Sequence, residues 1–116
     1  MALVKISQKE GRVPVTVFHL QDRVNLGNYA ELEQTAKDAH ENGMRNLVID
    51  LSETPSLTSI GIRALVVIHR MLSGAEDTKQ LKLAGAIPYI REMLDVSGVT
   101  QYIEIYDTVD EAVASF

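Results

Sequence analysis

Residues Leu47 to Leu72 read LVIDLSETPSLTSIGIRALVVIHRML, and this stretch decides the fold. Its aliphatic run Leu47–Val48–Ile49 ends on Asp50, as a buried parallel strand ends on a turn. Pro55 can continue neither a helix nor a central strand. Thr58 and Ser59 then stand where helix N-caps are preferred, and apolar residues fill most of the positions that follow. The stretch predicts a buried strand, a short loop and a mostly apolar helix.

Strand and helix signals alternate on both sides of this unit. Further strands are expected at residues 3–6, 13–20, 81–84 and 103–106, further helices at about 28–42, 88–97 and 109–115, and a turn at Ser73, Gly74 and Asp77. Asn28 with Glu31, and Thr108 with Glu111, have the spacing of capping boxes. The order ββαβαβαβα predicts one α/β domain over residues 1–116, with a mixed, mostly parallel sheet of about five strands and about four helices.

The composition excludes several classes of protein. Apolar residues make up 46% of the 116, which is enough for a core and argues against disorder. The formal net charge of −5 and the lack of a long basic run argue against nucleic acid as a partner. No stretch is long and apolar enough for membrane insertion, and the chain has no cysteine. These features predict a cytoplasmic protein.

No assembled catalytic site is evident, so we expect a protein that is not an enzyme and has no cofactor or metal. The glycines form no phosphate-binding loop motif. The three histidines, His19, His40 and His69, fall on one expected strand and two different helices, without metal-ligand spacing. Ser59 has two interpretations: a plain helix cap or first-turn residue, or a phosphate acceptor at a helix N-terminus, which stabilises a bound anion.

Three segments make the pattern specific. They are the strand-loop-helix unit LVIDLSETPSLTSIGIRAL, the segment QLKLAGAIPYIREMLDVSGV and the closing YDTVDEAVASF. With these segments the chain resembles, over essentially its whole length, the stand-alone STAS domains of the anti-sigma-factor antagonist family. The resemblance implies a STAS-like fold in which the helices pack mainly on one side of the sheet.

The resemblance also implies a function. In such antagonists a serine at the start of the central helix is phosphorylated by a cognate anti-sigma factor, a serine kinase with a histidine-kinase-like ATP-binding fold. The unphosphorylated antagonist binds that partner and frees the sigma factor, and phosphorylation abolishes the binding. Alignment on the family motif Asp-Ser-Ser-Gly puts the acceptor at Ser59, with Thr58 as the alternative. The implied partner-binding residues are Asn25, Thr58, Ser59, Ile60, Gly61, Ile62 and Arg63.

Two positions depart from the family pattern. Thr58 replaces the acidic residue before the acceptor, and Asn25 replaces the aspartate of the loop after the second strand. If the kinase or its Mg²⁺ uses those carboxylates, phosphorylation of this chain is weak or absent. If the site instead holds a phosphoserine, their loss lowers charge repulsion.

Two other functions compete with the phosphorylated switch. One is a STAS module that is never phosphorylated, acting as a scaffold or as a regulatory subunit of a membrane transporter ATPase. The other is a small α/β transferase or hydrolase, which the missing catalytic site disfavours. Phosphate transfer from an ATP-binding partner distinguishes the phosphorylated switch from the STAS module that is never phosphorylated.

Overall fold

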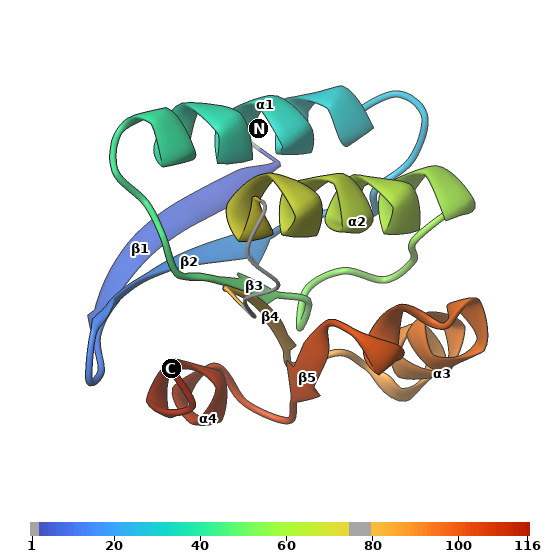
Figure 1. The fold of residues 1–116 in the computed structure, drawn as a ribbon. Coiled ribbons are helices and arrows are strands. Elements are labelled where there is room, and N and C mark those ends of the chain that lie inside the picture. The colour runs from blue at the N-terminus through green and yellow to red at the C-terminus, as the bar shows by residue number, and fades with distance from the viewer. Residues whose placement is uncertain (1–2, 75–79) are drawn as a thin grey trace.

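The computed structural model of the chain describes residues 3–74 and 80–116, in which strands and helices alternate (Figure 1). The predicted turn residue Asp77 lies outside the described residues. The strands are β1 (Val4–Glu10), β2 (Pro14–Leu20), β3 (Leu47–Asp50), β4 (Leu81–Ala84) and β5 (Glu104–Tyr106). The helices are α1 (Tyr29–Glu41), α2 (Ser59–Ser73), α3 (Pro88–Ser97) and α4 (Val109–Ala114), with the 3-10 turn η1 (Val99–Gln101) after α3.

The strands form one sheet in the order β1-β2-β3-β4-β5. β1 and β2 are an antiparallel hairpin, and all other neighbours are parallel. Parallel neighbours need a crossover, and the helices α1, α2 and α3 supply these crossovers in turn. The predicted mixed, mostly parallel five-stranded sheet is therefore confirmed.

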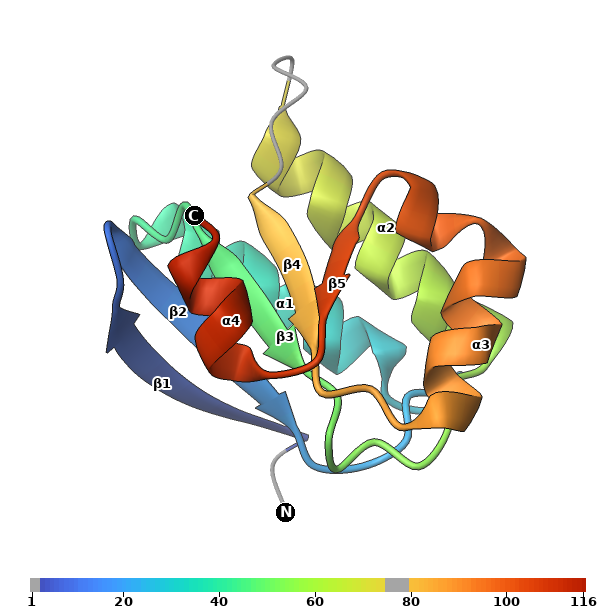
Figure 2. The same ribbon diagram turned by 90° about the horizontal axis from the view of Figure 1, so that it is seen from below.

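The two faces of the sheet carry cores of different size. The larger core joins α1, α2 and α3 to one face, through side chains such as Leu32, Leu65, Leu94 and Phe18. On the other face α4 covers only a small patch (Figure 2). In this patch Val113 packs with residues of β2, β3 and β4. Three of the four helices thus share one face, as expected. Because α4 is short, the part of the second face toward β1 has little cover, as Figure 2 shows.

The two predicted capping boxes have different outcomes. Thr108 caps α4 as expected: its hydroxyl accepts the N–H of Glu111 at 3.1 Å and lies 3.1 Å from the carboxylate of that residue. The prediction at Asn28 is wrong, because its side chain makes no bond to the helix. Glu31, the expected partner, instead accepts the N–H of Leu3 at 3.1 Å. The side chain of Asn28 thus bonds within its own loop, and that of Glu31 bonds to a residue distant in sequence.

One ammonium group lies on the side of the smaller core, between the sheet and the end of the chain. Lys82 is only 5% exposed, and its Nζ donates to the carbonyl and hydroxyl oxygens of Ser115 at 3.1 and 2.7 Å. The same Nζ lies 3.2 Å from Glu104 Oε1 and 4.4 Å from the ring centroid of Phe116. A buried charge requires such partners, so Lys82 fastens the carboxyl-terminal residues to β4.

Among the residues that the structure describes, no helix combines the length and the apolar character needed to cross a lipid bilayer.

Candidate functional site

The expected site lies where the loop between β2 and α1 meets the start of α2. Val24, in that loop, forms an isolated parallel bridge with Leu57. The N–H of Val24 donates to Ser56 O at 3.3 Å, and the carbonyl of Val24 accepts the N–H of Thr58 at 3.2 Å. The two segments, which are far apart in sequence, are therefore joined backbone to backbone.

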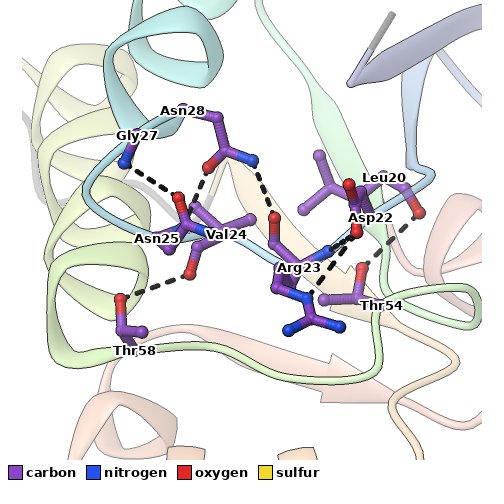
Figure 3. A network of polar contacts seen from close by, with 9 residues as sticks. All are labelled: Leu20, Asp22, Arg23, Val24, Asn25, Gly27, Asn28, Thr54 and Thr58. Atoms are coloured by element: carbon purple, nitrogen blue, oxygen red, sulfur yellow. Dashed lines mark hydrogen bonds and ion pairs between the residues drawn. The ribbon is translucent and has the colours of Figure 1, made fainter. Parts of the chain in front are cut away.

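Thr58 completes this junction with its side chain (Figure 3). Its hydroxyl donates to Val24 O at 3.2 Å and accepts the N–H of Gly61 at 3.3 Å, which makes Thr58 the N-cap of α2. One threonine thus satisfies a free amide of the helix and ties the helix to the loop. Ser59 is consequently not the cap but the first helical residue.

The lack of a side chain at Gly61 allows this close contact. It is buried, and a Cβ built on it would lie 3.0 Å from Val24 O and 3.1 Å from Val24 Cβ. A larger side chain would therefore push the helix away from the loop. The glycine that the family motif shares with this chain has a packing role, independent of any partner.

Asn25 organises the loop itself (Figure 3). Its side-chain oxygen accepts the N–H of Gly27 at 2.8 Å, and its backbone N–H donates to Asn28 Oδ1 at 2.9 Å. The amide of Asn28 also donates to Arg23 O at 2.8 Å. A carboxylate at position 25 could accept the same bond from Gly27, so the neutral residue is not forced by the local geometry.

Ser59 and Arg63 stand on the exposed side of the first turns of α2. Both residues are exposed, and their spacing of four places them on the same helix face. The first turn of α2 contains no acidic residue. A negative charge on Ser59 would thus meet the positive end of the helix dipole and an arginine one turn away.

The apolar residues proposed as partner contacts differ in how far their side chains are exposed to a partner. Ile62 is half-buried and packs against the larger core, so it contributes mainly to the fold. Ile60 is also half-buried. Leu26, which sequence reasoning did not single out, is 73% exposed in the loop next to this junction. An isolated leucine in a polar loop carries no periodic signal, so only the structure shows that its side chain is so exposed.

Sequence reasoning also missed a second polar cluster, which is centred on His19. His19 is hydrogen-bonded to Ser7 and to Asp50, residues of two other strands. The three positions are distant in sequence, and only the strand register brings them together. No group of three metal-ligating side chains occurs in the described parts of the chain.

The fold and this junction define a STAS domain, and the chain belongs to the STAS domain family, whose sequence model matches residues 7–112. A curated relative from Bordetella bronchiseptica, named "Putative anti-sigma factor antagonist BtrV", is 27% identical over 97 residues, which span 84% of this chain and 82% of BtrV.

Solved structures show the same fold. An anti-sigma factor antagonist from Mycobacterium paratuberculosis superposes with a TM-score of 0.83 at 21% identity, over 97% of this chain and 91% of that one. The Bacillus cell fate determinant SpoIIAA in its phosphorylated form gives 0.70 at 13% identity, over 97% of both chains. At these identities the two structures establish the fold alone.

Proposed function

We propose that this chain is an anti-sigma factor antagonist: a protein-binding switch that is turned off by phosphorylation of Ser59. Its partner would be an anti-sigma factor that is also a serine kinase with a histidine-kinase-like ATP-binding fold. In this switch the chain acts by binding and is the kinase's substrate. The observation that carries the proposal is the exposed hydroxyl of Ser59, held at the start of α2 by the bonds between Thr58 and Val24.

The surroundings of Ser59 favour a switch over a simple structural role. A phosphate there adds a charge of about −2 at a helix start, where it is stabilised by about 0.3–1 kcal/mol when exposed. Arg63 on the next turn offers a partner for the same charge. The fold should therefore tolerate the modification. A partner packed over this spot would instead bury a dianion, which costs affinity.

The contact surface would extend from Ser59 to the adjoining loop. Arg63 on the helix and Leu26 on the loop are both exposed, and they combine a charge with an apolar side chain at one junction. We include Asn25, Thr58, Ile60, Gly61 and Ile62 in this surface or its support. Thr58 and Gly61 support it from within, because they fix the helix against Val24.

The test uses a kinase-type anti-sigma factor, sought among the proteins encoded near this gene, in assays of phosphate transfer and binding. After reaction with ATP and Mg²⁺, mass spectrometry should find one phosphate on the peptide that contains Thr58 and Ser59, and fragmentation should place it on Ser59. Ser59→Ala should bind the kinase persistently in the presence of ATP, and Ser59→Asp should bind weakly. Equal affinity of both variants, with no phosphopeptide, would contradict the switch.

Three further variants sharpen the result. Arg63→Glu should weaken kinase binding at least about tenfold, whereas Arg70→Glu, the same change near the other end of α2, should not. Thr58→Asp keeps a good N-cap and restores a carboxylate before the acceptor. Faster phosphorylation of Thr58→Asp would mean that the kinase uses this carboxylate, and slower phosphorylation would mean that charge repulsion dominates. Binding without transfer in every variant would identify an unphosphorylated scaffold.

A further inference from the structure

A hydrogen-bonded relay of serine, histidine and aspartate crosses three strands on the face of the sheet that carries α4. Ser7 Oγ lies 2.9 Å from His19 Nε2, and His19 Nδ1 lies 2.8 Å from Asp50 Oδ2. The strands align His19 with Asp50 in register. On the helix-rich face of the same sheet lie Phe18 and Ile49, so the relay is on the opposite side from α1 and α2.

The hydrogen bonds of Asp50 fix which atom donates and which accepts in each bond of the relay. Burial by itself would raise the pKa of Asp50, but the N–H of Ser52, at 3.0 Å from Oδ1, and the bond from His19 hold that pKa below its usual value. An ionised carboxylate can only accept, so His19 donates through Nδ1. In neutral His19 the Nε2 atom is then the acceptor, and the Ser7 hydroxyl is the donor.

All three side chains of the relay are partly buried, and Asp50 is more buried than His19. The side chain of Asp50 is 13% exposed and that of His19 is 29% exposed, and Ser7 is half-buried. All three line a cavity of about 300 Å³, together with Lys5, Leu20, Gln21 and Glu53. The cavity is large enough for a short acyl group and open enough for one to enter. Lys5 adds a positive charge to its wall, on the strand position opposite His19.

We propose that Ser7 is a nucleophile that accepts an acyl group from small activated donors, such as aryl esters or thioesters. His19 is its general base, and Asp50 is a positioning residue that holds the histidine tautomer. Ser7 Oγ bonds to the acyl carbon while its proton passes to His19 Nε2. The bond to the leaving group then breaks, and the alcohol or thiol departs with that proton. The product is an acyl ester of Ser7, formed without oxidation or reduction.

This activity is separate from the proposed switch. Ser59 stands at the start of α2, whereas the relay belongs to β1, β2 and β3 and faces away from that helix. A Ser59→Ala protein should therefore react at Ser7 like the wild type. The two proposals can fail independently, because one is read from a phosphate and the other from an acyl group.

The experiment uses 4-nitrophenyl acetate as the acyl donor and the full chain. Mass spectrometry should find one acetyl group on the peptide that contains Ser7, and Ser7→Ala should lose it. His19→Gln keeps the serine but removes the base, so acetylation of Ser7 should slow at least about a hundredfold. Asp50→Asn should lower the rate constant of acetylation, with little change in the donor concentration that gives half the maximal rate.

The control variant is His40→Gln, because a surface histidine can itself react with this ester. His40 lies on α1 and contacts Met44 O at 3.1 Å, far from the relay in the fold. Its replacement should leave acetylation of Ser7 unchanged. Melting temperatures of all variants show whether each is folded. Acetyl groups on Lys5 in place of Ser7, or equal labelling of Ser7 in the wild type and in folded His19→Gln, would overturn the proposal.

Discussion

Replacing Gly61 by alanine tests the geometry on which the candidate site depends. In an open helix this change stabilises by up to about 1 kcal/mol, because glycine is a poor helix former. Here the new Cβ would lie 3.0 Å from Val24 O, 3.1 Å from Val24 Cβ and 3.2 Å from Val24 Cγ1. Val24 cannot move easily, since three hydrogen bonds tie it to Ser56 and Thr58. Overpacking of this kind costs about 1–3 kcal/mol, so we expect a net loss of about 1 kcal/mol.

The assay is chemical denaturation with a parallel measurement of the melting temperature. A loss of about 1 kcal/mol corresponds to a fall of about 4 °C in the melting temperature of a domain of this size. Val24→Ala removes the methyl groups but leaves the carbonyl and Cβ in place, so the double variant should recover only part of the loss caused by Gly61→Ala. A Gly61→Ala protein that is more stable than the wild type would refute the close approach of helix and loop.

Three further changes test other parts of the structure. Lys82→Ala should lower the free energy of unfolding by roughly 2–3 kcal/mol, which is less than for a fully buried ion pair because Glu104 is partly exposed. Lys82→Met should lower it less than Lys82→Ala does, because methionine keeps the apolar stem of the side chain. Because the pKa of Asp50 is lowered in the fold, its ionised carboxylate stabilises the folded protein at pH values above its unfolded pKa of about 3.8. This stabilisation is lost as the pH falls through the pKa of Asp50 in the folded protein. Asp50→Asn should therefore lose less stability than the wild type on acidification, as denaturation at several pH values can measure. Thr58→Val should cost about 1 kcal/mol in the same assay, whereas Thr58→Ser, which keeps the cap, should cost much less.

The fold and the start of α2 were accessible from the sequence because both depend on local signals. The run at Leu47, the proline at position 55 and the hydroxyl residues Thr58 and Ser59 set a strand, a loop and a helix start through backbone preferences that act within a few residues. Topology rules then place that helix start near the loop after β2, since both follow strands that are parallel neighbours.

What the sequence by itself determined is the order of elements, the mixed sheet and the place of Ser59 at the start of α2. Only the tertiary structure decided that Asn28 bonds to its loop and not to its helix, that Gly61 admits the carbonyl of Val24, and that His19 joins residues of two other strands. The physical reason is the range of the interactions. Helix and strand preferences act between near neighbours in the chain, whereas side-chain hydrogen bonds and close packing depend on strand register and on how helices rest on the sheet.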